Sequence, residues 1–562
     1  MSDTNDDYKK QISDLLDNYE DGRDVFIKND WDWPLKLKPG AHAKGVSSNY
    51  MDLVEQVTGI IAKSKYGLDT YPNEIEILDS EQMLDVYVNI GMPSNYVHWS
   101  HGKEREKLGR DYMLGMMNLA YELVINSNPS ISYCMTHNTN TMMALVIAHA
   151  AQGHNAFFKN NVMFTQFTNA AEIRGDLKRF ADFVTECEEK YGVARVERIL
   201  DACHALQQHA IDYTVRPVIK KTAKQKEMHK AAVELTRLNT RDVVIETLTA
   251  KKQDKAFRSL IDDDDDDRPI NENNLLRYIG NAAPHLKDWE RKIITMFCDR
   301  AQYFYPQGRT KVMNEGFASF WHYKILHDMH DLKLISDSMM MEALKSHSDV
   351  LFQPGFTDPR YQGFNPYTLG FAVFEDLERI CKTPTDEDRK WFPEIAGNPD
   401  WLAVHKEAAY NFHDESFIYQ YLSPKVMRDF HMISLLDDDR EKEYVVTAVH
   451  DDEGYRRIRA SLAASYDLAS RVPQIVPYAC DERGDRTLML KHTMHNRKPV
   501  HKENTGEVLK HIHQLWGHPV ILASFNEDDK SEAGALTCPP NFPPITRGGP
   551  IDRFLNPSQL AL

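Results

Sequence analysis

The stretch that decides the fold runs from residue 138 to residue 161 and reads NTNTMMALVIAHAAQGHNAFFKNN. Its apolar residues recur at intervals of three and four, which predicts a helix that faces the core. The same spacing runs through KLGRDYMLGMMNLAYELVINSNP (residues 107–129) and predicts a second core-facing helix. An Asn-Pro turn at Asn128–Pro129 separates the two segments. We therefore expect a helical core around this pair.

Two histidines, His149 and His154, interrupt the apolar helix. An imidazole in such surroundings needs a polar partner. The segment resembles the H-E-x-x-H helix of zinc peptidases, in which the histidines are four apart on one face and the Glu is the general base. Here the spacing is five, and Ala150 stands where the Glu would be. Five residues rotate about 140° around an α-helix, so both histidines can share a metal only across a π-bulge or at a helix end.

A second segment, VMNEGFASFWHY (residues 312–323), places Glu315 and His322 seven residues apart on one helical face. Its N-E-G-F-A-S-F stretch resembles the helix that supplies the glutamate ligand in gluzincin aminopeptidases. This resemblance makes Glu315 a candidate metal ligand. The alternative is a buried carboxylate that only accepts hydrogen bonds.

A third segment, ERILDACHAL, puts Glu197, Asp201 and His204 on one face, as in carboxylate-bridged metal sites of helical bundles. Exposed helices show the same pattern. Glu122, which has apolar neighbours, is a further candidate. If these faces converge, imidazoles and carboxylates could hold zinc or another divalent transition metal and acidify a water molecule for hydrolysis. If they do not, the same residues form a hydrogen-bonded polar core.

A chain of 562 residues is longer than a single hydrophobic core usually supports, so we expect several structural parts. We predict an N-terminal helical arm (1–75), a main helical domain (76–425), a small α/β domain (426–525) and a tail (526–562). The α/β domain follows from a change of apolar period after Ser423, with elements in the order β-β-α-β-β-α and a short closing strand. Six consecutive aspartates at 262–267 predict an exposed loop. The predicted fold class is mainly α, and its metal core could be zincin-like or bundle-type.

Composition narrows the range of partners. Lys plus Arg number 67 against 84 Asp plus Glu, a net charge of −17, which repels nucleic acid and anionic membranes. The N-terminus has no apolar signal region, and no stretch approaches 18 consecutive apolar residues. We therefore expect a cytoplasmic protein without membrane insertion or a nucleic-acid partner. The seven cysteines include no C-x-x-C pair, which argues against a disulfide framework.

Longer motifs carry a family resemblance. They include LDTYPNEIEILDSEQMLDVYVNIGMP, VIAHAAQGHNAFFKNN, VMNEGFASFWHY, NPYTLGFAVFEDLERIC and DESFIYQYLSPKVMRDF. By these motifs the chain resembles the SpoVR (stage V sporulation protein R) family, and in particular its members in non-sporulating bacteria. The resemblance implies a link to spore cortex formation or to stationary-phase and stress physiology. It also implies a PrkA-type AAA+ serine kinase and a protein with a von Willebrand-like domain as partners.

Two functions stay open at this point. The first is a metal-dependent hydrolase acting on peptide or cell-wall material, with His149, His154 or both, together with His204 and Glu315, near the metal. The second is a non-catalytic adaptor in a kinase-centred stress complex, which would use the C-terminal α/β domain and the acidic loop as docking surfaces. No catalytic residue is assigned from the sequence.

Overall fold

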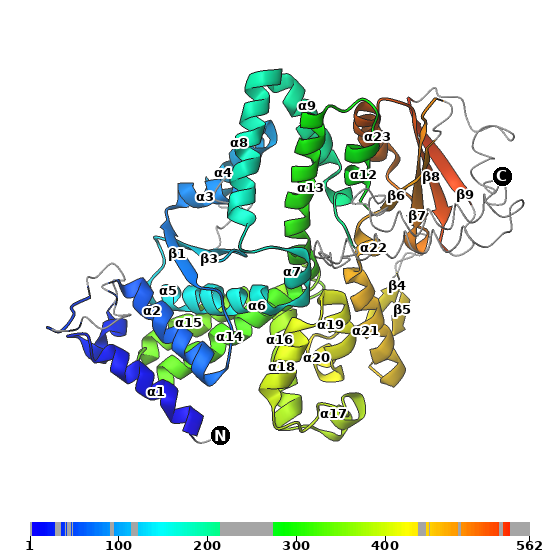
Figure 1. Ribbon diagram of the computed structural model, residues 1–562. Coiled ribbons are helices and arrows are strands. Elements are labelled where there is room, and N and C mark those ends of the chain that lie inside the picture. The colour runs from blue at the N-terminus through cyan, green and yellow to red at the C-terminus, as the bar shows by residue number, and fades with distance from the viewer. Residues whose placement is uncertain are drawn as a thin grey trace, which may run out of the picture. The chain divides into compact units, whose positions relative to one another are not determined.

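The computed structural model describes residues 3–28, 35–39, 41, 47, 49–89, 95–113, 122–213, 274–436, 445–448, 450–480, 485–527 and 532–539 (Figure 1). The chain divides into two compact units. Unit 1 comprises residues 1–197 and 302–472, and unit 2 comprises residues 198–301 and 473–562. The division falls within two helices, α9 (Val193–Ala205) and α13 (Asp288–Arg309). The acidic run at 262–267 lies outside the described residues.

Unit 1 contains a three-stranded sheet that the sequence did not predict. Its strands are β1 (Asn73–Leu78), β2 (Glu122–Ile125) and β3 (Ser130–Met135), in the order β1-β3-β2. β1 runs parallel to β3, and β2 runs antiparallel to it. The predicted helix over 107–129 is therefore wrong at Glu122, which lies on a strand, although α4 (Trp99–Met113) is helical. The strand ELVI has only four residues, three of them apolar, which is too few for periodicity to separate a strand from a buried helix.

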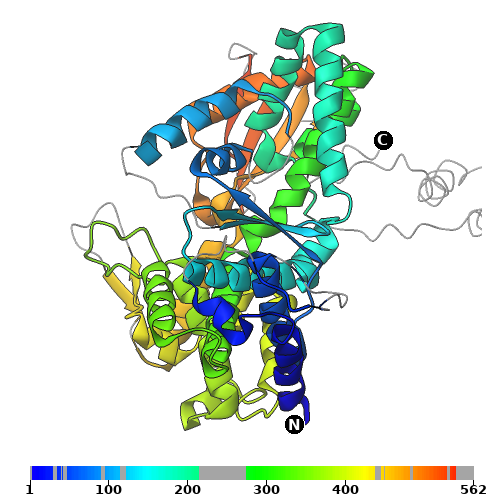
Figure 2. The same cartoon turned by 90° about the vertical axis from the view of Figure 1, so that its left-hand side faces the viewer.

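The helix expected over 138–161 is confirmed. It consists of α5 (Asn140–Ile147), a π-helical segment η3 (Ala148–His154) and α6 (Asn155–Asn160), which follow one another directly. The Thr139 hydroxyl caps its start by accepting a hydrogen bond from the Met142 N–H at 3.2 Å. Every residue from 140 to 158 is buried. Figure 2 shows this cyan helical segment running beneath the sheet, and η3 contacts β2 and β3.

Helix α14 (Lys311–Asp331) is held at very close range between η3 and α16 (Pro366–Lys382). A Cβ atom added to Gly153 of η3 would lie 2.6 Å from the Ala318 Cα atom. A Cβ atom added to Gly316 would lie 2.3 Å from the carbonyl carbon of Gly370. Only glycine permits backbones to approach this closely. The first contact fixes α14 beside the histidine-bearing helix, and the second fixes it beside α16.

The start of α14 is capped from a distant part of unit 1. The Asp414 carboxylate accepts hydrogen bonds from the N–H groups of Val312 and Met313, at 3.0 and 2.9 Å. A carboxylate at a helix N-terminus satisfies donors that have no partner within the helix. Asp414 thus fixes the helical turn that precedes Glu315.

Other helices and two short strands complete unit 1, whose largest described apolar cluster includes Phe317, Phe320, Trp321 and Phe374. Tyr8, Ile12 and Leu16 of the N-terminal helix belong to the same cluster. These elements are α1 (Asp3–Leu16), α2 (Tyr50–Ile60), η2 (Ile61–Lys65), α3 (Ser80–Val88), α7 (Val162–Phe167), α8 (Ile173–Tyr191), α15 (Asp337–Val350), α17 (Asp386–Trp391), α18 (Trp401–Tyr410), α19 (Asp414–Tyr421), α20 (Pro424–Asp429), β4 (Ser434–Leu436), β5 (Val445–Ala448), α21 (Asp452–Tyr466) and α22 (Leu468–Arg471).

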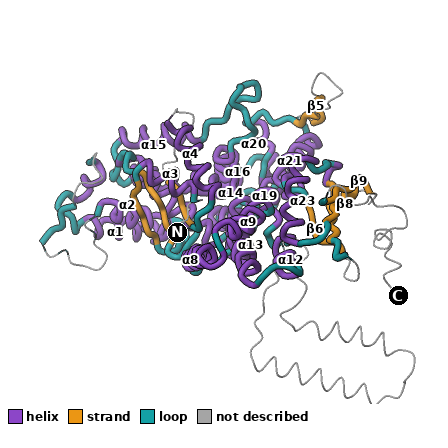
Figure 3. Tube along the Cα trace, turned by 90° about the horizontal axis from the view of Figure 1, so that it is seen from above, coloured by secondary structure: helices purple, strands orange, loops and turns teal. Residues whose placement is uncertain are grey.

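Unit 2 contains a four-stranded sheet in the order β6-β7-β8-β9. Its strands are β6 (Gln474–Cys480), β7 (Leu488–Met494), β8 (Val520–Asn526) and β9 (Glu532–Cys538). The parallel pair β7 and β8 is joined through α23 (Lys502–Trp516), and the other pairs are antiparallel. Figure 3 shows α23 beside these strands. Helix α12 (Leu275–Ala282) contacts α23 and β6.

The element order predicted for the C-terminal part is confirmed, since β4, β5, α21, β6, β7, α23 and β8 follow in that sequence. Residues 532–538, which fall within the predicted tail, form the strand β9 and pair with β8. Residues 426–525, predicted as one domain, lie on both sides of the division at 472. The domain boundaries therefore stay a prediction. The mainly helical class with a small C-terminal sheet is confirmed.

Candidate metal centre

The two histidines and Glu315 form one buried cluster. The Nε2 atom of His154 lies 3.5 Å from the Glu315 Oε2 atom, and the Nε2 atom of His149 lies 3.9 Å from it. One ligand atom from each of the three residues fits within 4.8 Å. Ligands placed tetrahedrally about 2.1 Å from a zinc ion lie roughly 3.4 Å apart. The side chains therefore need only small shifts to hold a metal ion.

The π-helical segment explains how histidines five residues apart can share this cluster. It spans residues 148–154 and includes both histidines. A π turn closes its hydrogen bond over one more residue than an α turn, which returns the fifth residue to the same face. The two rings are in contact, with their centroids 4.5 Å apart. The condition set by the sequence, a π-bulge between the histidines, is met.

His154 is oriented by Asn314. Its Nδ1 atom lies 2.9 Å from the Asn314 side-chain oxygen, which can only accept a hydrogen bond. Nδ1 therefore carries the proton, and the lone pair of Nε2 points at Glu315. Burial, together with His149, lowers the pKa of His154 to about 4, so the ring is neutral and suited to bind a metal ion.

His149 begins a chain of three imidazoles. Its Nδ1 atom lies 2.8 Å from His322 Nδ1, and His322 Nε2 lies 2.8 Å from His347 Nδ1. Burial holds the pKa of His322 well below its ordinary value and lowers that of His347 to about 4, so both are neutral. A neutral imidazole donates through one nitrogen and accepts through the other. With His149 Nδ1 as donor, each ring donates outward along the chain, and the Nε2 lone pair of His149 faces the cluster.

Two carboxylates differ in their environment here. Burial opposes ionisation of Glu315, but the two histidines and the Tyr367 hydroxyl outweigh it and hold its pKa below the ordinary value. Glu122 reaches the cluster from β2, with its Oε1 atom 3.8 Å from His149 Nε2. Burial, reinforced by the charge of Glu315, raises the pKa of Glu122. The site thus pairs an ionised carboxylate with one that holds a proton more readily.

Two polar atoms at the centre have no hydrogen-bond partner among the described residues. They are His149 Nε2 and Glu315 Oε2, and both are buried. Buried polar atoms in folded proteins are almost always satisfied, so an unsatisfied pair that converges indicates a missing partner. A lone pair and a carboxylate oxygen together suit a cation. The donor set therefore fits a metal ion.

A cavity of about 290 Å³ opens onto the cluster. Glu122, His154, Glu315 and Tyr367 line one part of it. Leu123, Val124 and Phe158 give it an apolar wall, and Gln307 and Lys311 add polar groups. A small molecule or a side chain that enters this cavity would meet the cluster directly.

The structure brings together most of the predicted site residues. His149, His154 and Glu315 form the cluster, and Glu122 and His322 contact it. His204 belongs to unit 2, where its ring packs edge-on against Phe297 at 5.2 Å. Its role as a ligand stays a prediction.

Three residues of the site were missed from the sequence: Asn314, His347 and Tyr367. Asn314 and Tyr367 stand in motifs that were singled out, but nothing local marks them as contacts of a histidine or a glutamate. His347 lies on α15 between Ser346 and Ser348, so its neighbours in the sequence do not mark it as a buried histidine. A hydrogen-bond partner is defined by the meeting of helices, which a local pattern does not encode.

Fold and site together define a mainly helical protein with a histidine–glutamate cluster that could hold a metal ion. Residues 47–471 match the family described as SpoVR like protein, and residues 473–527 match the SpoVR-like C-terminal domain. The chain belongs to the SpoVR family. It is 46% identical over 477 residues to the uncharacterized protein YcgB of Escherichia coli (strain K12), a match that covers 85% of this chain and 92% of that protein. No solved structure matches the chain.

The family boundary agrees with the structure at one point. The two family matches meet at residues 471–473, next to the division between unit 1 and unit 2 at residues 472 and 473. Within the part of the chain that is described, no helix has both the length and the apolar character to cross a membrane.

Proposed function

We propose that the protein is a divalent-metal-dependent hydrolase that cleaves an amide bond in peptide or cell-wall material. The observation that carries the proposal is the convergence of His149 Nε2, His154 Nε2 and Glu315 Oε2. Two of these atoms are buried and have no hydrogen-bond partner within the described part of the chain. Two imidazoles and one carboxylate form the ligand set of many hydrolytic zinc sites, in which a further position stays open for water or substrate. Zinc is the metal we expect.

Each residue of the site has a role in this proposal. His149, His154 and Glu315 hold the metal ion. Asn314 and His322 orient the two imidazoles through their Nδ1 atoms, at 2.9 and 2.8 Å. The Tyr367 hydroxyl helps to hold the pKa of Glu315 below its ordinary value, which favours the ionised carboxylate that a cation binds. The cation, when bound, supplies Lewis acidity that polarises a carbonyl group and acidifies water.

Glu122 supplies the general base that the helix lacks. Ala150 stands where a zinc-peptidase helix carries its Glu, but Glu122 comes from β2 to the same cluster and lines the cavity. Its carboxylate accepts a proton from the attacking water as the new C–O bond forms at the substrate carbonyl carbon. The same proton passes to the leaving nitrogen when the C–N bond breaks, which leaves an acid and an amine.

Metal content tests the ligand set. Elemental analysis of the purified protein should find about one divalent ion per chain, and His154→Ala and Glu315→Gln should lose it. The matched control is His330→Ala on the same helix, because His330 pairs with Asp337 at the surface and should leave the metal content unchanged. Circular dichroism checks that each variant is folded. A wild-type protein without metal after purification and after reconstitution with zinc would refute the proposal.

The hydrolase assignment needs a second variant. Glu122→Gln should keep the metal and lose hydrolysis of a peptide or peptidoglycan-peptide library, by about 10²–10⁴-fold. If the metal is present but no amide substrate is cleaved, the cluster has a structural role. In that case, loss of partner capture on deletion of residues 426–562 would favour the adaptor function.

A further inference from the structure

A second cavity lies in unit 1, between helices α17, α19 and α21. Its volume is about 290 Å³, and its walls are Lys390 and Trp391 of α17, Tyr419 of α19, and Arg456 and Arg459 of α21. We call it the arginine–tryptophan pocket. Arg456 and Arg459 are three residues apart on one helical face. Their guanidinium carbons lie 5.3 and 4.8 Å from the centre of the Trp391 ring, so the indole is flanked by two cations.

Two donors in the walls of this pocket are buried and lack an acceptor among the described residues. They are the Nη2 group of Arg459 and the indole Nε1 group of Trp391. The Nε group of Arg459 is satisfied, because it donates to the Leu422 carbonyl oxygen at 2.9 Å. An unmade hydrogen bond at a buried donor is costly, and most so at a charged one. Two such donors belong to residues that line one cavity, and a ligand with acceptor oxygens could satisfy them.

The pocket also carries more positive than negative charge, since Asp452 is the carboxylate that acts on both Lys390 and Arg456. Lys390 pairs with Asp452, but no described carboxylate lies within ion-pair distance of Arg456 or Arg459. Burial lowers the pKa of Arg459 to about 10, and the charge of Arg456 contributes to this shift. A half-buried cation without an anionic partner is a strained arrangement that an incoming anion would relieve. In a chain of net charge −17, this local excess of two positive charges stands out.

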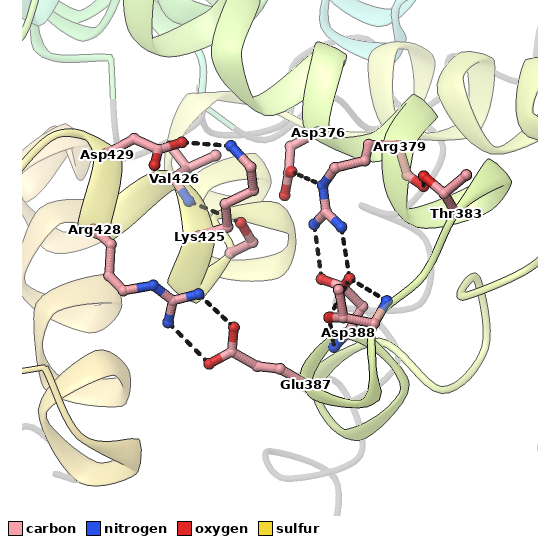
Figure 4. A network of polar contacts seen from close by, with 11 residues as sticks. Asp376, Arg379, Thr383, Glu387, Asp388, Lys425, Val426, Arg428 and Asp429 are labelled. Carbon is pink, nitrogen blue, oxygen red and sulfur yellow. Dashed lines mark hydrogen bonds and ion pairs between the residues drawn. The ribbon is translucent and has the colours of Figure 1, made fainter.

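The pocket is preformed, because α17 is anchored at its first turn. Figure 4 shows both anchors: Glu387 faces the Arg428 guanidinium, and Asp388 faces that of Arg379. Both pairs are bidentate, with distances of 2.6 and 2.9 Å for Glu387 and 2.7 and 2.8 Å for Asp388. Bidentate pairs fix orientation as well as distance. Trp391 is therefore presented to the pocket by a rigid helix.

We propose that the arginine–tryptophan pocket binds a phosphate monoester. The two unpaired guanidinium groups match the charge of a phosphate monoester, which is close to −2 near neutral pH. The unsatisfied donors of Arg459 and Trp391 supply hydrogen bonds to its oxygens. Tyr419, which is 60% exposed, and the Trp391 ring offer aromatic surface to the organic part of the ligand at the mouth of the pocket. This site shares no residue with the metal cluster.

Isothermal titration calorimetry on the full-length protein tests the proposal, with inorganic phosphate, phenyl phosphate and acetate as probes at constant ionic strength. Both phosphates should bind saturably at one site, with phenyl phosphate the tighter of the two, and acetate should bind at least about tenfold more weakly because it carries one charge. Arg456→Gln should weaken phosphate binding by about tenfold or more. Trp391→Phe keeps an aromatic ring but removes the N–H, and should weaken binding about fivefold.

The matched control is Arg457→Gln, because Arg457 neighbours Arg456 on α21 but pairs with Glu453 at the surface. This variant should bind phosphate as the wild type does. The proposal is overturned if wild-type protein binds neither phosphate saturably or if acetate binds as tightly as phosphate. It is also overturned if Arg456→Gln and Arg457→Gln have the same affinity. Arg456 lies at the exposed rim, so its replacement leaves the core intact.

Discussion

Replacing Gly316 by alanine tests the packing that places Glu315. The new Cβ atom would lie 2.3 Å from the carbonyl carbon and 2.4 Å from the Cα atom of Gly370. Ordinary carbon contacts need about 3.5 Å, so α14 and α16 would have to separate by roughly 1 Å. Both obstructing atoms belong to the backbone and cannot rotate away. Because overpacking of a core costs about 1–3 kcal/mol, we expect Gly316→Ala at the upper end of that range.

Urea denaturation followed by circular dichroism measures this cost, with Gly308→Ala as the matched control. Gly308 lies in α13 with no atom within 4 Å of its added Cβ, so this change should stabilise the protein by about 0.5–1 kcal/mol through helix propensity. Gly316→Ala should shift the midpoint in the opposite direction. Equal stabilities of the two variants would refute the close crossing of α14 and α16.

Three further predictions follow from contacts described above. His322→Ala removes the partner of His149 Nδ1 and should lower metal affinity about 10–100-fold in competition with a chromophoric chelator, and an unchanged affinity would contradict its orienting role. Asp414→Ala leaves the N–H groups of Val312 and Met313 without their acceptor and should cost about 2 kcal/mol in urea denaturation, against little change for exposed Asp386→Ala. Burial alone would raise the pKa of Asp388, but Arg379 and Thr385 outweigh it and lower the pKa to about 2. Since this pKa lies below the unfolded value of about 4, the stability that Asp388 adds is complete above pH 4 and is lost as the pH falls towards 2. Asp388→Asn should therefore be less stable than wild type at neutral pH by about 2 kcal/mol, and stability curves measured against pH should converge in that acidic window.

Local pattern was sufficient for several parts of the fold. The apolar spacing around His149 predicted the central helix, and the change of period after Ser423 predicted the strand and helix order of the C-terminal part. The five-residue spacing of the histidines also indicated that they could share a metal across a π-bulge, and the π-helical segment is present. These features depend on residues that are close together in the chain, so they can be predicted from the local sequence pattern.

The features that could not be predicted from the sequence depend on contacts between residues far apart in the chain. The strand β2 was mistaken for a helix because its short apolar run pairs with β3, and pairing is not visible in a four-residue pattern. The chain of imidazoles joins His149 to residues 173 positions away and then 25 further along. The arginine–tryptophan pocket likewise combines three helices, so its residues had no shared motif.

The π turn between the two histidines has a consequence for how such chains are compared. A π turn is an α turn with one residue inserted, so the usual H-x-x-x-H and the present H-x-x-x-x-H can present the same pair of nitrogens. A sequence that lacked one of the residues between His149 and His154 would close ordinary α turns and keep the ligand pair. Alignments that treat this single-residue gap as loss of the motif would separate proteins whose sites are spatially equivalent.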